Sequence, residues 1–178
     1  MEADWEFDVG KDSPVIAARW DGLVDLRDEP QRVHEIVETQ RLSGLAEALV
    51  RLNADDSPVW TSKTDVFVPE EVDPDELSSS REDAASATAC YVDVLMREGW
   101  TWDSSDASER ACRLICSRIK EIPLERCRVD MVIRRAQDAG LNKFGATVYL
   151  TACGKTSTAA KDRLVECLMA CVDELVNA

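Results

Sequence analysis

The chain has 178 residues, of which 45% are hydrophobic and 31% charged, and these values are typical of one globular domain. The first residues are acidic and lead into no apolar segment, so no signal peptide is expected. No run of about 18 apolar residues occurs, so we predict no membrane span. The chain has seven cysteines, an odd number, and it is large enough to fold without disulfides. We therefore expect reduced thiols and a cytoplasmic location.

The net charge of −14 is unevenly distributed along the chain. Residues 1–89 hold 22 acidic and 8 basic side chains, whereas residues 90–178 hold 13 of each. Residues 110–135 alone contain eight arginines and lysines. This pattern indicates internal charge complementarity or a surface that attracts a charged partner, beside the simpler interpretation of solvated faces. The overall negative field argues against nonspecific nucleic-acid binding.

The N-terminal part is predicted to contain extended segments. Residues 5–9 alternate apolar with acidic side chains, as in a half-buried strand, and residues 15–20 form a second extended run. Asp21-Gly22 then predicts a tight hairpin to residues 23–26.

The middle of the chain is predicted to be mainly helical. Pro30 begins a helical pattern that continues, with an interruption at Ser43-Gly44, to Asn53, and residues 59–68 predict a further strand. Residues 69–83 are acidic, contain proline and have few large apolar groups. We interpret them as a mobile connection, the candidate lobe boundary of an otherwise single domain spanning residues 1–178.

Two helices, two strands and a closing helix are predicted for the remainder. Ser79 and Glu82 resemble a capping box for a helix to about Glu98, with Ala85, Ala89, Val92 and Met96 on its inner face. Asp106 and Glu109 predict the cap of a second helix that ends near Pro123. Residues 127–134 and 144–152 alternate as strands, and residues 156–176 have helical spacing. The expected fold is α+β, with a mostly antiparallel sheet, helices packed on one face and a closing C-terminal ββα unit.

Gly154, Lys155 and Thr156 follow a β-branched run and precede a helical pattern, which is the order of parts in a nucleotide-binding phosphate loop. Tyr149 occupies the position of the first glycine of that loop, and the intervening residues have strand character. A true phosphate loop is therefore disfavoured. An anion held by the amides of the helix start and by Lys155 remains one hypothesis, and an ordinary capped turn is the other.

The cysteines and the single histidine offer no complete reactive site. Cys112 and Cys116, like Cys167 and Cys171, are spaced to share a helix face with leucines and isoleucines. Core packing explains this spacing better than a zinc site, which usually has a shorter spacing. His34 lies among charged residues and has no second histidine to complete a metal cluster. We therefore predict no cofactor and no metal.

Charged residues alternate on two of the predicted strands. If helices cover one side of the sheet only, an uncovered face of mixed charge is expected, either as a binding surface or as a solvated face with weak ion pairs. Its residues would be Lys63, Asp65, Arg128, Asp130 and Arg134. Trp100 and Trp102 lie at a predicted helix joint, where one ring is a candidate interface anchor.

These observations favour a small, acidic, cytoplasmic protein that acts without catalysis by binding another protein or itself, with no nucleic acid and no membrane as partner. The alternative is an enzyme or ligand-binding protein that holds an anionic small molecule near residues 154–156.

Overall fold

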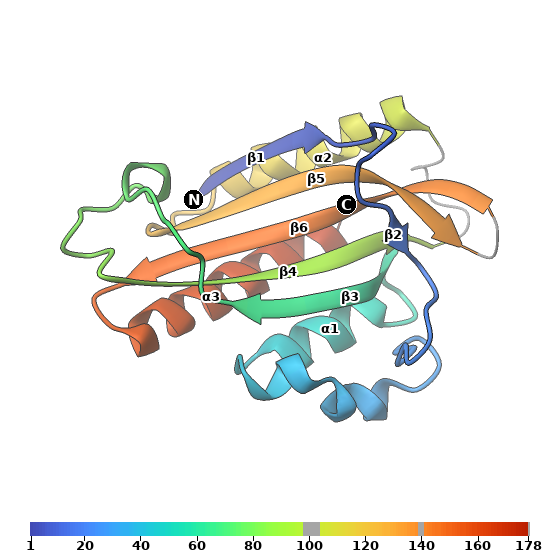
Figure 1. The fold of residues 1–178 in the computed structure, drawn as a ribbon, viewed down its shortest axis with the longest axis horizontal. Helices are drawn as coiled ribbons and strands as arrows, with labels where there is room; N and C mark the ends of the chain where they lie inside the picture. The colour runs from blue at the N-terminus through green and yellow to red at the C-terminus, as the bar shows by residue number, and fades with distance from the viewer. Residues whose placement is uncertain (98–103, 139–140, 178) are drawn as a thin grey trace.

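The computed structural model describes residues 1–97, 104–138 and 141–177 (Figure 1). The strands are β1 (Glu2–Phe7), β2 (Ile16–Ala17), β3 (Val59–Phe67), β4 (Ser86–Met96), β5 (Cys127–Asp138) and β6 (Leu141–Gly154). The α-helices are α1 (Leu45–Asn53), α2 (Ser105–Lys120) and α3 (Ser157–Val176). Short 3-10 helices are η1 (Pro30–Glu35), η2 (Val37–Gln40) and η3 (Asp75–Leu77).

These strands join one six-stranded sheet in the order β1-β5-β6-β4-β3, and β2 pairs with β5 outside this path. β1 and β2 run parallel to β5, and the other neighbours are antiparallel. Strands from before and after residues 69–83 thus belong to the same sheet. The three α-helices lie behind the sheet in the view of Figure 1, and we call the opposite side the front face. The predicted α+β class is confirmed, including the closing ββα unit formed by β5, β6 and α3.

The core fills the space between the sheet and the helices. From α3 it receives a stripe at helical spacing, which includes Leu164, Leu168, Cys171 and Leu175, and Ala160 is buried in the first turn of the same helix. From α2 it receives Cys112, Ile115, Cys116 and Ile119. The core-packing interpretation of the helical cysteines is therefore confirmed.

Both long helices begin with a side-chain cap. Ser104 Oγ accepts a hydrogen bond from the Ala107 amide at 3.3 Å, and Thr156 Oγ1 accepts one from the Ala159 amide at 3.2 Å. The prediction that Asp106 caps α2 was wrong by two residues, because Ser104 makes this bond and Asp106 lies in the first turn. An acidic side chain in the first turn still favours the helix through its dipole.

The helix predicted from Ser79 to about Glu98 is wrong, because residues 86–96 form strand β4. Their apolar residues fit helical spacing, but β4 lies inside the sheet, between β6 and β3. Such a strand is largely buried on both faces, so it lacks the alternation that marks a half-exposed strand. The long-range pairing with β6 and β3 outweighs the local helical signal.

The predicted hairpin at Asp21-Gly22 is also wrong. Only Ile16–Ala17 is extended, and it pairs with β5 and not with residues 23–26. Residues 10–27, which we call the crossing segment, run over one end of the front face toward β3 (Figure 1). Ser62 Oγ donates to the Ala17 carbonyl at 2.5 Å, and the Arg27 guanidinium lies 3.7 Å from the centre of the Trp60 ring. A second, smaller core of Ile16, Ala18, Trp60, Leu95 and Ala136 forms beneath this segment.

The long helical pattern over residues 30–53 is divided in the structure. It forms η1, η2 and, after Gly44, helix α1. Gly44 has a φ of +87° and a Cβ there would lie 2.7 Å from Val165 Cγ1, so the chain turns tightly against α3 at this point. The predicted break at Ser43-Gly44 therefore corresponds to the real start of α1.

Candidate functional site

The front face carries side chains in rows that cross the strands. One row is made of successive register partners: Asp4 of β1, Asp130 of β5, Tyr149 of β6, Tyr91 of β4 and Asp65 of β3. Register partners in neighbouring strands point to the same face. The rings of Tyr91 and Tyr149 lie 5.8 Å apart between centroids, with planes inclined by 50°. A pair of tyrosines between carboxylates therefore occupies the middle of the front face.

The adjacent row contains a buried acidic side chain, Asp93. It is 7% exposed, and its Oδ1 accepts a hydrogen bond from Thr147 Oγ1 at 2.6 Å. Burial raises the pKa of the Asp93 carboxyl, and the Thr147 hydrogen bond and the positive charges of Arg134 and Lys63 offset part of this effect. Lys63 belongs to a β-bulge between Thr61 and Thr64, which places an extra residue of β3 opposite β4.

The two arginines on the front face of β5 are engaged by carboxylates. Arg128 Nη2 lies 2.8 Å from Asp130 Oδ1, and Arg134 Nη2 lies 3.6 Å from Asp8 Oδ2. Arg134 also donates to the Tyr149 hydroxyl at 3.4 Å. These contacts neutralise the arginines locally and hold the Tyr149 ring beside β5.

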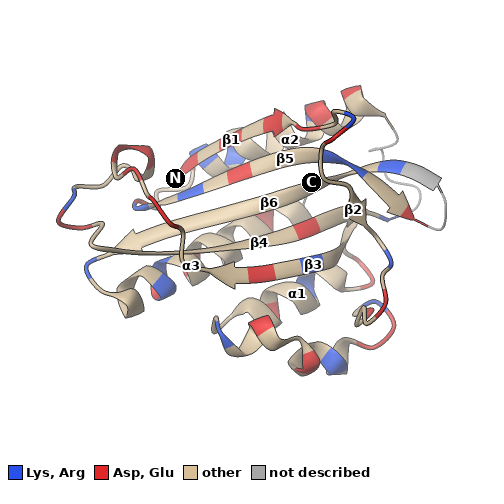
Figure 2. Cartoon of the chain, viewed as in Figure 1, with Lys and Arg blue, Asp and Glu red and all other residues tan. Residues whose placement is uncertain are grey.

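The charged residues that sequence reasoning singled out for a sheet face all belong to β3 or β5, and register places Asp65 and Asp130 in the tyrosine row of the front face. Figure 2 shows where acidic and basic residues lie along these strands. Strands β4 and β6 separate the two groups, which at the usual strand spacing are about 14 Å apart. Among the described residues no ion pair joins one group to the other, and Asp65 pairs with Arg41 at 3.1 Å instead. Sequence reasoning missed Tyr91 and Asp93 at the centre of the face, because it interpreted β4 as a helix. The charged residues of β3 and β5 that the sequence singled out are Lys63, Asp65, Arg128, Asp130 and Arg134.

The β1 side of the front face is acidic. Glu2, Asp4 and Glu6 are exposed, and Asp4 and Glu6 line a cleft of about 300 Å³ together with Glu76 of η3. Ser78, one residue after η3, donates from its hydroxyl to Glu2 Oε1 at 2.9 Å, which ties this connection to β1. We call Glu2, Asp4, Glu6 and Glu76 the acidic margin.

Gly154, Lys155 and Thr156 form the turn between β6 and α3. Thr156 caps the helix, and a Cβ on Gly154 would lie 2.8 Å from the Ala160 amide nitrogen, so the helix start packs directly against the strand end. Lys155 Nζ lies 3.7 Å from Glu82 Oε1 and 3.4 Å from Asp83 Oδ1. These carboxylates already neutralise the lysine, and the anion hypothesis stays a prediction.

The thiols and the histidine lie apart from the front face. All seven cysteines are buried and unpaired, and burial raises the pKa of Cys90 and Cys116 to about 12. No group of three or more histidine, cysteine or acidic side chains placed to hold a metal ion occurs within residues 1–97, 104–138 and 141–177. His34 is exposed on η1. Trp100 and Trp102, the predicted interface anchors, lie outside the described residues.

Comparisons with protein-family models, with curated proteins and with solved structures gave no match. Among the described helices, none is long and apolar enough to cross a membrane.

Proposed function

We propose that this protein is a non-catalytic binding module whose front face recognises a basic polypeptide segment of another protein. The observation that carries the proposal is the tyrosine pair in the middle of a sheet face that none of the described α-helices covers, with the acidic margin at its side. A cytoplasmic location is part of the proposal and is supported by seven buried, unpaired thiols.

The charges on this face favour a basic partner. Arg128 and Arg134 are already paired with Asp130 and Asp8, so the exposed carboxylates of the acidic margin are in excess. The chain as a whole carries a charge of −14, which attracts a basic segment over distances of about one Debye length. Complementary charge of this kind gives specificity and a fast association rate.

The aromatic centre supports the same conclusion. Tyr91 and Tyr149 are only partly buried, so each presents an accessible ring surface beside carboxylates. Arginine and lysine side chains pack favourably over such rings, by about 0.5–1 kcal/mol at exposed sites. Tyrosine is also enriched in protein interfaces, because its ring is apolar and its hydroxyl can hydrogen-bond.

Self-association through the same face is less favourable than binding to a basic partner. A second copy would bring its own acidic margin against this one, and like charges placed together across an interface are strongly unfavourable. We therefore assign the face to a different protein and not to a homodimer.

The test is a titration with a short, fluorescein-labelled peptide of alternating arginine and glycine, followed by fluorescence anisotropy at low and at physiological salt. Asp4→Lys combined with Glu6→Lys should weaken binding by about tenfold or more. The matched control combines Glu47→Lys with Asp162→Lys on α1 and α3, at exposed positions away from the front face. Both double variants change the net charge from −14 to −10, so their difference isolates the face from the total charge.

Tyr149→Ala adds a variant that leaves the net charge unchanged, and it should weaken binding by several-fold through the lost ring surface. Equal weakening by both charge-reversed variants would show that the peptide responds to total charge only and would refute the proposal. Unchanged affinity of Tyr149→Ala for the peptide would show that the tyrosine pair is not part of the binding surface.

A further inference from the structure

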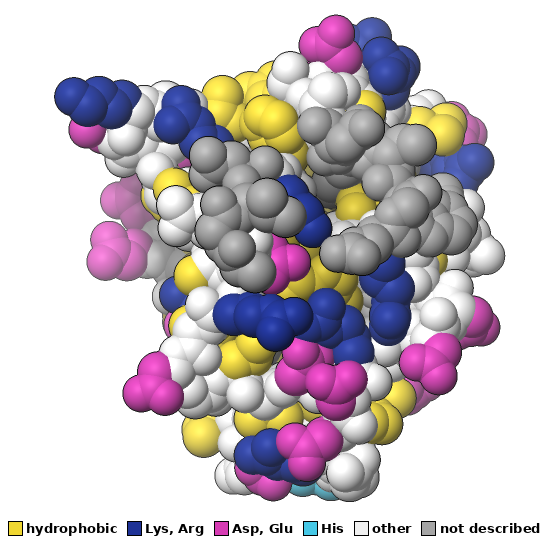
Figure 3. Space-filling model, turned by 90° about the vertical axis from the view of Figure 1, so that its right-hand side faces the viewer, with side chains coloured by type: hydrophobic (Ala, Val, Ile, Leu, Met, Phe, Trp, Pro, Cys, Tyr) yellow, Lys and Arg dark blue, Asp and Glu magenta, His cyan; other side chains and the backbone are white. Residues whose placement is uncertain are grey.

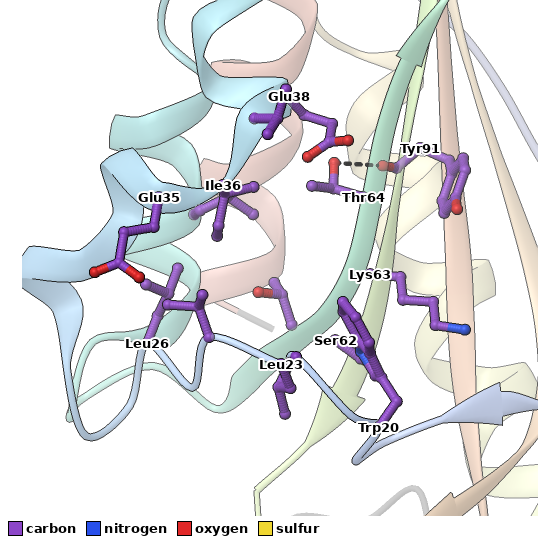
Figure 4. A pocket seen from close by; sticks show the side chains of 15 residues that line it. Trp20, Leu23, Leu26, Glu35, Ile36, Glu38, Ser62, Lys63, Thr64 and Tyr91 are labelled. Carbon is purple, nitrogen blue, oxygen red and sulfur yellow. Dashed lines mark hydrogen bonds between the residues drawn. The ribbon is translucent and has the colours of Figure 1, made fainter.

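A cavity of about 330 Å³ lies at the β3 edge of the sheet, distinct from the acidic margin at the β1 side. Most of its lining comes from residues 20–26 of the crossing segment, residues 35–38 at η1 and η2, and the β-bulge of β3 (Figure 4). Leu49 of α1 and Tyr91 of β4 complete it. This volume is in the range of natural small-molecule sites, about 300–1,000 Å³. Small-molecule sites of this kind combine an apolar wall with a few polar groups, and the lining of this cavity has both.

The wall of the cavity is mostly apolar. It is formed by Leu23, Val24, Leu26, Ile36 and Leu49, and by the indole of Trp20, which is 42% exposed. An apolar or aromatic body of a ligand would gain about 25 cal/mol for each Å² that it buries against these side chains. The cavity therefore favours a ligand with a hydrocarbon or aromatic part.

The hydroxyl groups at the β-bulge are already used within the protein. Ser62 donates to the Ala17 carbonyl at 2.5 Å, and Thr64 donates to the Tyr91 carbonyl at 2.7 Å (Figure 4). Thr61 Oγ1 accepts a hydrogen bond from Asn53 Nδ2 at 2.7 Å. These hydroxyls keep part of their hydrogen-bonding capacity, but they are neutral, so the charged side chains of the lining discriminate most strongly between ligands of different charge.

Of the two carboxylates in the lining, only Glu38 is available to a ligand. Glu35 accepts two hydrogen bonds from Arg32, at 2.9 and 2.8 Å. The Glu38 carboxylate has no hydrogen bond or ion pair with any of the described residues. Figure 4 shows it directed toward Thr64, at the edge of β3.

The one lysine of the lining extends away from Leu26 and Ile36 and lies near Trp20. Figure 4 shows the Lys63 side chain on the other side of β3 from Leu26 and Ile36. Its Nζ lies 5.7 Å from the centre of the Trp20 ring, and its charge acts on Asp93 of the front face. Figure 3 shows the side of the molecule that lies on the right in Figure 1. Basic side chains gather across the middle of this view, and acidic side chains lie directly beneath them.

We propose that this cavity binds a small organic amine, with its apolar or aromatic body between Trp20, Leu26 and Ile36 and its ammonium group at the Glu38 carboxylate. The half-buried position of Glu38 strengthens a charge-assisted hydrogen bond relative to bulk water. The net charge of −14 raises the local concentration of cations at the surface, which favours an amine over an acid of the same shape.

The test uses the full chain and three probes that share one ring and differ in their polar end: 2-phenylethylamine, 2-phenylethanol and 3-phenylpropanoate. Affinities are measured by isothermal titration calorimetry, and the change in tryptophan emission is recorded in parallel. The amine should bind about tenfold more tightly than the alcohol, and the carboxylate should bind most weakly. Glu38→Gln should reduce the affinity for the amine to that for the alcohol.

Two controls assign the effect to this cavity. Glu47→Gln removes one exposed carboxylate of α1 outside the lining and should leave the affinity for the amine unchanged. Trp20→Phe should abolish most of the emission change that the amine causes. The proposal is overturned if the alcohol or the carboxylate binds as tightly as the amine, if Glu47→Gln acts like Glu38→Gln, or if Trp20→Phe keeps the full emission change.

Discussion

Gly154 lies where β6 ends and the chain turns into α3, and this position has no room for a side chain. A Cβ built there would lie 2.8 Å from the Ala160 amide nitrogen and 3.0 Å from the Ala159 carbonyl carbon. Both atoms belong to the backbone, so they cannot rotate away as a flexible side chain could. The Ala160 amide also donates to the Thr156 carbonyl at 2.9 Å, so moving the helix start strains this hydrogen bond as well.

The cost of Gly154→Ala follows from this geometry. An ordinary contact needs at least 3.4 Å, so the first turn of α3 would have to move about 0.6 Å away from the end of β6. Overpacking of this kind costs about 1–3 kcal/mol. Alanine also restricts the unfolded chain, which stabilises the folded state by about 0.4–1 kcal/mol and offsets part of the cost. We expect a net loss of about 1–2 kcal/mol.

Gly10→Ala is the matched control for this substitution. The Cβ at Gly10 would lie 2.9 Å from Ser13 Oγ, which is a side-chain atom of a partly exposed residue and can rotate away. Both variants restrict the unfolded chain equally, so the difference between them measures the backbone clash alone.

Thermal and urea unfolding of both variants is the assay. For a chain of this length each kcal/mol lowers the melting temperature by about 2–4 °C, so Gly154→Ala should melt about 2–8 °C below the natural protein. Gly10→Ala should melt at or slightly above it, by up to about 4 °C, because only the effect on the unfolded chain remains. If Gly154→Ala melts at or above Gly10→Ala, the close packing of α3 against the end of β6 is refuted.

Three further predictions concern stability and reactivity. Asp93→Asn should raise the free energy of unfolding at pH 7. Burial raises the pKa of the Asp93 carboxyl in the folded protein above its ordinary value of 3.8. The protonated carboxyl therefore favours folding below pH 3.8, and this contribution is lost as the pH rises through the folded pKa. Urea midpoints of the two proteins should therefore converge near pH 3.5, and a constant difference from there to pH 8 would contradict the reasoning. Arg97→Met should lower the free energy of unfolding by about 1–3 kcal/mol, measured by urea unfolding, because Arg97 Nη2 donates to the Asn53 and Ala54 carbonyls at 2.6 and 2.8 Å. A loss below about 0.5 kcal/mol would show that water replaces the guanidinium as the donor to these carbonyls. Burial raises the pKa of four thiols, those of Cys90, Cys112, Cys116 and Cys171. Iodoacetamide should modify them only after unfolding, as mass spectrometry can show. Rapid modification in the native state would place them at the surface.

Much of the C-terminal half could be predicted from the sequence. Strands β5 and β6 alternate apolar and polar residues because only their inner faces meet the helices, and α3 carries one apolar stripe for the same reason. Alternation also predicts which residues of a strand point away from the core, and the charged residues of β3 and β5 occupy such positions.

The N-terminal half was harder to predict, because its local signals conflict with its tertiary surroundings. Asp21-Gly22 does form a turn, with Gly22 at a φ of +90°, but residues 23–26 find no strand to pair with. Ile16–Ala17 pairs instead with residues 136–137 of β5, a partner that no local pattern can indicate. A turn signal fixes the conformation of a few residues and leaves their long-range partners open.

By itself, the sequence determined the elements whose two sides differ in environment, because a difference between core and solvent appears directly as periodicity. The tertiary structure decided everything that depends on distant partners. It placed β4 inside the sheet, where burial on both faces removes the periodic signal, and it thereby brought Tyr91 against Tyr149. It also carried the crossing segment over the front face to β3, where segments distant in sequence enclose the cavity with Glu38 in its lining. Such arrangements arise from the packing of the whole chain, and no single stretch of residues encodes them.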